Sequence, residues 1–552
     1  MTRNQRFRAL AVLAGAFWLA LACGGGGGGT SEELAPDQTL NFPLVDDVGD
    51  LDPGAMSAAV DIDIFRNVYS GLYKFDDSLK EIPDIAKGQP DISADGLTYT
   101  FHMKNDVKFS NGDPVKADDF IFSWNRAAAK QGDYASVFEP VKGYKDVEDG
   151  KSQTLSGLSK IDDFNFKATL SKPAGYWFTE VALWTAWVVN TKVVKAAGKD
   201  TDSGWAEKPD TAIGTGAFKM TARTPKQSID FVPNAKYYGG STGPIKRVHI
   251  EIVADQKAQL TKYESGGYSL IGYANQAPTP EDIIRYQNDP KLKKELTLQS
   301  SARTTWIGFN FKTGPFAGID AGKNGRKAFS LAVDRAQLVD IACAKGATCQ
   351  AATGGVITKG LKGYLGDGKD PNAKFDASQA KSLYQQWDPN GAKVKGLTYS
   401  FNSSATNKAV GENLQSQWKS NLGVNVSLSA ADRATFFKTR SKCAYTIFRH
   451  SWGADYDHPQ DWFDFLFVTG GGSAGTCYSN PQLDKLVQQA NQKPLDAALS
   501  DYNQASQIMI DDVQYGGLFY GVQPYVVHSY VKGVGGNALY DYYWSEIKIL
   551  KH

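Results

Sequence analysis

The sequence predicts an α/β protein built from several lobes, on the basis of three observations. The chain has 552 residues, which at roughly 150 residues per domain allows three or four domains. Strand patterns of period two and helix patterns of period 3.6 alternate along it. No interior stretch is rich enough in Pro, Gly or Ser to link independent domains. We therefore expect lobes that share strands rather than separate globules.

The predicted elements of the first half follow from residue spacing. Residues 97–103 alternate apolar and polar side chains, which is typical of a strand with one buried face. A turn at 111–114 precedes a helix that begins at Ala117, where Phe120 and Trp124 fall at helical spacing. Two aspartates directly after Ala117 suit the positive end of the helix dipole.

Further along the chain the same two patterns recur. Residues 248–252 and 305–311 alternate and are predicted strands. A polar helix is expected over 256–264, and later helices around 408–421 and 481–491.

A tryptophan-rich run over 176–189 looks suited to a membrane, but it contains Glu180 and is shorter than a bilayer span. Trp177, Trp184 and Trp187 lie at roughly helical intervals. We expect them to pack in the core of a lobe, and a binding face is the alternative.

The composition excludes several classes of protein. Lys and Arg number 60 and Asp and Glu number 59, so the formal net charge is +1. A nucleic-acid binder of this size carries a basic excess, and we expect no nucleic-acid partner. Hydrophobic residues make up 42% of the chain, which is typical of a globular protein with a large core. The only long uncharged apolar run lies at the N-terminus, which argues against a polytopic membrane protein.

The N-terminal segment is predicted to direct the protein into the secretory route and then to tether it to the membrane. Three arginines precede an apolar run over 9–22, which suits a secretory signal. The run ends at Cys23, which six glycines follow, and this pattern resembles a bacterial lipoprotein processing site. Residues 1–22 would be removed, Cys23 lipidated, and 23–36 would form a tether to the membrane. A plain signal peptide with an incidental cysteine is the alternative.

Four further cysteines would then lie in an oxidising compartment, where an even number favours disulfides. Three pairings of Cys343, Cys349, Cys443 and Cys477 are open. Zinc is a poorer explanation because no pair has C-x2-C spacing and no histidine lies suitably near.

Seven groups of short motifs lie between residues 51 and 459. From the N-terminus they are Leu51-Asp52-Pro53 with the stretch from Phe65 to Phe75; Ile82-Pro-Asp-Ile-Ala86; Asp95 to Phe101 with Val107-Lys-Phe109; Asp113 to Phe120 with Ser123, Trp124 and Arg126; Ile213 to Lys219; Asn310, Pro315-Phe316 and Arg326 to Arg335; and Trp452 to Pro459. In this order they resemble the family 5 solute-binding proteins of bacterial ABC importers, which include oligopeptide- and dipeptide-binding proteins.

The resemblance implies a fold similar to periplasmic binding proteins of class II, or cluster C. Two main lobes would surround a ligand cleft, with an extra inserted lobe and crossing strands as the hinge. By the motif positions, the three lobes would have the following boundaries: lobe I, 37–77, 205–300 and 505–552; lobe II, 78–204; lobe III, 301–504.

The resemblance also implies a peptide site near the motif Trp452-Gly-Ala-Asp455. In peptide-binding members the Asp of this motif holds the ligand's α-amino group, and an Arg three residues before the Trp, here Arg449, can meet its carboxylate. Trp452 and Tyr456 would wall the pocket. A buried ammonium needs a carboxylate, and a carboxylate pairs well with a guanidinium. A cap or salt bridge for Asp455 and a structural role for Arg449 are the alternatives.

A run of aspartates, namely Asp455, Asp457, Asp461 and Asp464, suggests calcium at first sight. No glycine stands where an EF-hand loop needs one, and the apolar residues between the aspartates fit a buried helix. We expect no metal and no cofactor. No motif supports catalysis, so we expect no enzymatic activity.

The expected function is that of a monomeric extracytoplasmic lipoprotein that captures small peptides by lobe closure. It would deliver them to an ABC permease and ATPase complex and would touch the membrane only through its lipid anchor. The alternative ligands are an oligosaccharide or another small solute. The alternative functions are those of a secreted hydrolase and of a solute sensor.

Overall fold

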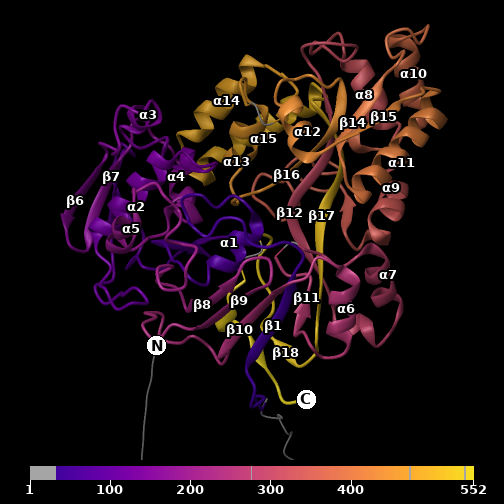
Figure 1. The fold of residues 1–552 in the computed structure, drawn as a ribbon. Coiled ribbons are helices and arrows are strands. Elements are labelled where there is room, and N and C mark those ends of the chain that lie inside the picture. Colours follow the sequence, from indigo (N-terminus) through magenta and orange to yellow (C-terminus); the bar gives the residue numbers. More distant parts are fainter. Residues whose placement is uncertain (1–32, 275, 472–473, 540–541) are drawn as a thin grey trace, which may run out of the picture.

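The computed structural model describes residues 33–274, 276–471, 474–539 and 542–552. Strands and helices alternate through these residues, as the α/β prediction requires, and gather around three larger sheets (Figure 1). Residues 1–22 and Cys23 lie outside the described residues. At the end of the expected tether, Leu34 bridges Leu550 and Ala35 is buried, so the folded body begins before the expected boundary at residue 37.

The first sheet joins the start of the chain to its middle. Its strands, in sheet order, are β1 (Thr39–Leu44), β10 (Arg247–Ile252), β9 (Ser228–Pro233) and β8 (Phe218–Thr224). β1 runs parallel to β10, and the other pairs are antiparallel. Leu40 and Phe42 of β1 lie beside Val248 and Ile250 of β10, and all four are buried. Alternation of period two therefore directs one face of this sheet into the core.

The second sheet lies at the left in Figure 1. Its order is β4 (Asp91–Ile92), β5 (Thr98–His102), β7 (Asn165–Thr169) and β6 (Leu158–Asp162). Helix α2 (Ala117–Lys130) packs on it through Trp124, whose ring meets Phe101 and Phe166 edge-on. The remaining elements of this part are α1 (Ala59–Phe65), β2 (Tyr73–Phe75), β3 (Glu81–Pro83), α3 (Tyr144–Glu148), α4 (Trp177–Glu180) and α5 (Thr191–Ala197).

A buried ion pair fixes α2 to the N-terminal segment. Arg126 Nη1 donates to Asp52 Oδ1 at 2.8 Å, and Ser203 Oγ donates to the other carboxylate oxygen at 2.6 Å. Asp52 comes from the Leu-Asp-Pro motif of the sequence. Its carboxylate is therefore structural, since a buried charge of this kind needs a partner.

The third sheet has seven strands and lies at the right in Figure 1. Its order is β11 (Leu270–Ile271), β17 (Tyr515–Val527), β12 (Leu296–Phe309), β16 (Ile447–Gly453), β14 (Thr398–Asn402) and β15 (Ser427–Ala431), with β13 (Cys349–Ala351) on β17. β12 and β17 are antiparallel strands of 14 and 13 residues. This pair runs along the middle of the molecule from the region of the first sheet to the opposite end (Figure 1).

Helices surround the third sheet, and two short strands end the chain. The helices are α6 (Gln256–Glu264), α7 (Pro280–Asn288), α8 (Lys323–Leu331), α9 (Arg335–Ala342), α10 (Ala377–Trp387), α11 (Ala405–Leu422), α12 (Arg433–Arg440), α13 (Gln460–Trp462), α14 (Pro481–Asn491) and α15 (Leu495–Asp511). The final strands are β18 (Val531–Lys532) and β19 (Lys548–Ile549). Among the described residues, no helix is both long and apolar enough to cross a bilayer.

Two hydrophobic cores hold most of the buried apolar side chains. The first core is shared by the two four-stranded sheets, and the second lies under the seven-stranded sheet. Tyr456 belongs to the first core although its neighbours in sequence contribute to the second. The expected lobes I and II thus share one core, and the exact lobe boundaries stay a prediction.

The four C-terminal cysteines form two disulfides in the structure. Cys343 is joined to Cys349, and Cys443 is joined to Cys477. The second bond ties the chain that follows α12 to the loop before α14.

Candidate functional site

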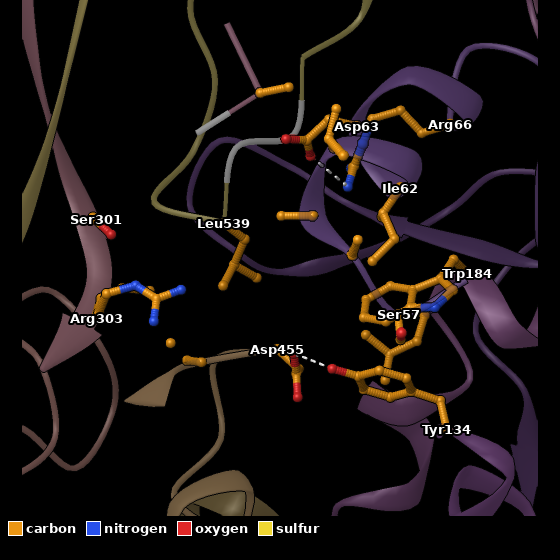
Figure 2. Close-up of a pocket in the computed structure, with 18 of the residues that line it drawn as sticks. Ser57, Ile62, Asp63, Arg66, Tyr134, Trp184, Ser301, Arg303, Asp455 and Leu539 are labelled. Atoms are coloured by element: carbon orange, nitrogen blue, oxygen red, sulfur yellow. Dashed lines mark hydrogen bonds and ion pairs between the residues drawn. The ribbon is translucent and has the colours of Figure 1, made fainter. Parts of the chain in front are cut away.

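A cavity of about 570 Å³ lies between the two cores. One wall comes from α1, residues 182–184 and Tyr134, and the other from β12, α12 and the end of β16 (Figure 2). The volume lies in the range of small-molecule and short-peptide sites. The cavity therefore has the size and placement of a ligand cleft.

Asp455 follows β16 and reaches the cavity. Tyr134, from the opposite wall, donates its hydroxyl to Asp455 Oδ1 at 2.8 Å (Figure 2). Burial raises the pKa of Asp455 to about 6, although the Tyr134 hydroxyl and the Arg303 charge both favour the ionised form. The group is therefore a carboxylate at neutral pH that becomes protonated in mild acid.

Asp461 lies behind Asp455 and is fully buried. Trp452 Nε1 donates to Asp461 Oδ2 at 3.1 Å, and the backbone N–H of Asp455 approaches the same oxygen at 3.4 Å. Burial raises the pKa of Asp461 well above its usual range, and the nearby Asp455 charge raises it further. Of these two close carboxyl groups, Asp461 therefore holds its proton more tightly than Asp455.

Three arginines line the wall formed by β12 and α12. Arg303 comes from β12, whereas Arg433 and Arg440 stand at the two ends of α12. Figure 2 shows Arg303 pointing from its strand into the cavity, on the side opposite Tyr134. The cavity thus offers both a carboxylate and guanidinium groups.

The aspartates considered for calcium have separate partners. Asp457 accepts the Lys362 backbone N–H at 2.6 Å, and Asp464 accepts from Asn491 and Gln460. Among the described residues, no group of three or more His, Cys, Asp or Glu side chains is arranged to hold a metal ion.

Comparison with known proteins identifies the family. The family described as bacterial extracellular solute-binding proteins, family 5 Middle, matches residues 80–474. The chain belongs to this family.

Other family 5 proteins are similar over nearly their whole length. The oligopeptide-binding protein OppA of Bacillus subtilis is 26% identical, with 93% of this chain and 94% of that protein covered. The periplasmic OppA of Haemophilus influenzae is also 26% identical, with coverage of 91% and 92%. Members of the family are solute-binding proteins, as the sequence motifs predicted.

Solved structures confirm the predicted fold class. The murein tripeptide-binding protein MppA of Escherichia coli matches with a TM-score of 0.76 at 23% identity, covering 94% of this chain and all of the other. Haemophilus influenzae OppA in complex with the peptide RPPGFSPFR matches with a TM-score of 0.73, at the same identity and coverage.

Two of the four predicted ligand residues of this family 5 protein line the cavity. Asp455 and Trp452 are on its wall. Arg449 is not: the lining on β16 begins at Ser451, further along the strand, and Arg449 Nη1 donates to Asn402 Oδ1 at 3.2 Å. Burial and the charges of Arg303 and other arginines lower the pKa of Arg449 to about 10.

Tyr456 does not line the cavity either, because its side chain is buried in the first core. Its hydroxyl lies 3.0 Å from Glu180 Oε1 and also contacts Gln460. Burial raises the pKa of Glu180 well above its usual range. Tyr456 therefore anchors the segment that carries Asp455 to the first core.

Sequence reasoning missed Tyr134, Arg303 and Arg440, since none stands in a motif that marks a binding residue. It placed the tryptophans of 176–189 in the core, and Trp177, Trp184 and Trp187 are indeed buried. Trp184 and Trp187 also border the cavity, so the binding-face alternative stays open for their exposed edges.

Proposed function

We propose that this family 5 protein captures peptides by their free amino group, with Asp455 as the partner of the ammonium. The observation that carries the proposal is the placement of the Asp455 carboxylate in the cavity, where Tyr134 meets it from the opposite wall. An ammonium desolvated in such a cavity needs a charged acceptor. The oligopeptide-binding names of the relatives support the same ligand class.

Capture would proceed by closure of the two walls around the ligand, followed by delivery to an ABC permease and ATPase. Lipidation of Cys23 and a tether over 23–36 belong to the same proposal and rest on the sequence pattern alone. Arg449 remains a candidate for the ligand's carboxylate, if its side chain leaves Asn402.

The test is calorimetric titration with Ala-Ala-Ala and with its N-acetylated form. Replacing Asp455 by Asn removes the charge that the ammonium needs, and we expect a loss of about 2–5 kcal/mol. This corresponds to at least roughly 30-fold in affinity. The N-acetylated peptide should bind the unchanged protein just as weakly.

Asp457→Asn is the matched control, because Asp457 lies in the same loop but not on the cavity wall. It should leave the affinity for Ala-Ala-Ala unchanged. Equal affinity of the Asp455→Asn variant and the original protein would overturn the proposal. Tight binding of a cello-oligosaccharide, which Trp184, Trp187 and Trp452 could stack against, would favour the sugar alternative.

A further inference from the structure

The guanidinium groups on the cavity wall carry more positive charge than the wall balances. Arg303 contacts Ser451 Oγ at 3.5 Å, and Arg433 lies over the ring of Phe437. Within the described part of the chain, none of Arg303, Arg433 and Arg440 forms an ion pair with a carboxylate. Of the acids that line the cavity, Asp455 is already hydrogen-bonded to Tyr134, Asp63 is paired with Arg66 at 3.6 Å, and Asp46 is exposed to solvent.

Arg440 is the most unusual member of this group. It is only 8% exposed, and its Nε and Nη1 have no hydrogen-bond partner in the structure. Its guanidinium packs against the rings of Phe436 and Phe437. Burial and, to a smaller extent, the charge of Arg449 lower the pKa of Arg440 to about 9. A buried, unpaired guanidinium is costly, so an anion that met it would be strongly favoured.

A glycine on the neighbouring strand gives the Arg303 side chain room at this wall. Gly453 is the cross-strand neighbour of Arg303 in the β12–β16 pair. A Cβ atom at Gly453 would come within 2.8 Å of Arg303 Nη2. The glycine therefore leaves room for the guanidinium to lie against β16 and to face the cavity (Figure 2).

A peptide with neutral side chains brings one ammonium and one carboxylate. The ammonium would meet Asp455, and the single carboxylate would bring one negative charge against the two guanidinium charges of Arg303 and Arg440. At least one of the wall arginines would then stay desolvated without a counter-charge. A second carboxylate on the ligand would remove that penalty.

We propose that the cavity selects acidic peptides, in which a side-chain carboxylate binds between Arg303 and Arg440, with Arg433 at the rim. This inference rests on the proposed function, because it takes Asp455 as the site of the amino group. It adds the chemical class of ligand that the cavity prefers.

The test compares Glu with Gln, which has the same shape but no charge, at each position of an alanine tripeptide. The six peptides are titrated calorimetrically into the full chain. At one position or more, the Glu peptide should bind at least tenfold more tightly than its Gln counterpart. Raising the salt concentration should reduce this ratio, because it screens the charge pair.

Two variants and a control assign the effect. Arg440→Gln should bring the Glu-to-Gln ratio close to one, and Arg303→Gln, at a less buried site, should lower it severalfold. Lys438→Gln removes a charge from an exposed position on the same helix that does not line the cavity, and it should leave the ratio unchanged. Thermal unfolding shows whether each variant is folded. If the Arg440→Gln variant is unfolded, the Glu-to-Gln affinity ratio of the Arg303→Gln variant decides whether the acidic preference depends on the wall arginines.

Each outcome separates the two proposals. Equal binding of Glu and Gln peptides at all three positions overturns the acidic preference and leaves peptide capture standing. A preference that survives both arginine substitutions also overturns it. Failure of every peptide to bind, with an intact fold, overturns the proposed function instead.

Discussion

Asp455 shows how neighbouring groups set the charge of one side chain. Tyr134 donates to it, the charge of Arg303 favours its ionised form, and the buried Asp461 lies behind it. Because Asp461 holds its proton more tightly, Asp455 is the first member of the pair to ionise as the pH rises. Its charge is therefore available to a ligand only above a threshold in pH.

Peptide affinity should accordingly fall in acid. The pKa of Asp455 is raised to about 6, so the carboxyl is protonated below that pH and cannot pair with an ammonium. Since the ionised fraction changes about tenfold per pH unit below the pKa, we expect binding of Ala-Ala-Ala to be about tenfold weaker at pH 5 than at pH 7. Calorimetry across this range measures it. The Asp455→Asn variant should show a flat profile, and an equal acid loss in that variant would assign the effect to another group.

At the scale of the residue, motifs predicted the site only in part. Asp455 and Trp452 were found because a local motif carries them. Tyr134 and Arg303 come from distant segments, and only the packing of the two walls brings them to Asp455. Sequence spacing contains no signal for a contact between residues 134 and 455. Arg449 has the expected residue type but is held at Asn402, which its motif could not reveal.

At the scale of the element, helix α12 carries two wall arginines and is fixed at its end by the disulfide between Cys443 and Cys477. This bond joins residues 34 apart in sequence, whereas the bond between Cys343 and Cys349 joins residues only six apart. In the chain-entropy account, the longer loop restricts the unfolded chain more.

Removing the longer disulfide should therefore destabilise the protein more. We expect the Cys443→Ser/Cys477→Ser variant to lose about 4 kcal/mol of unfolding free energy, and the Cys343→Ser/Cys349→Ser variant about 2 kcal/mol. Urea unfolding of both variants beside the original protein measures the difference. Equal losses would contradict the loop-length argument.

Regular amphipathic elements were predictable, and those made by distant pairing were not. The helices over 256–264 and 481–491 coincide with α6 and α14, because local spacing and caps determine their ends. The strand predicted at 305–311 corresponds to the end of β12, which runs from Leu296 to Phe309. The first half of β12 lacks a clear apolar alternation and is a strand because it pairs with β17. β17 contains Gly516, Gly517, Gly521 and Pro524, which are unfavourable in strands, so no sequence pattern indicated it.

At the scale of the whole molecule, the cavity lies between two cores. The β12–β17 pair runs along the middle of the molecule (Figure 1), with Val527 packed against the first core and Trp306 in the second. Bending of this pair would change the distance between the walls. The lobe boundaries inferred from the motifs are compatible with such a movement, although the two four-stranded sheets share a core.

Peptide binding should thus make the molecule more compact. We expect the radius of gyration measured by small-angle X-ray scattering to decrease on saturation with a tight-binding peptide. The Asp455→Asn variant at the same peptide concentration should show no decrease. Full occupancy by calorimetry with an unchanged scattering curve would contradict closure.

The contact between Tyr456 and Glu180 fixes the position at which a bound peptide would begin. Asp455 is the residue before this anchor, so its carboxylate is tied to the first core and to Tyr134. A peptide held there by its amino group would have its first residue fixed at Asp455, whatever its length. Peptides of different lengths would then share their first contacts and differ only in how far they reach along the arginine-lined wall.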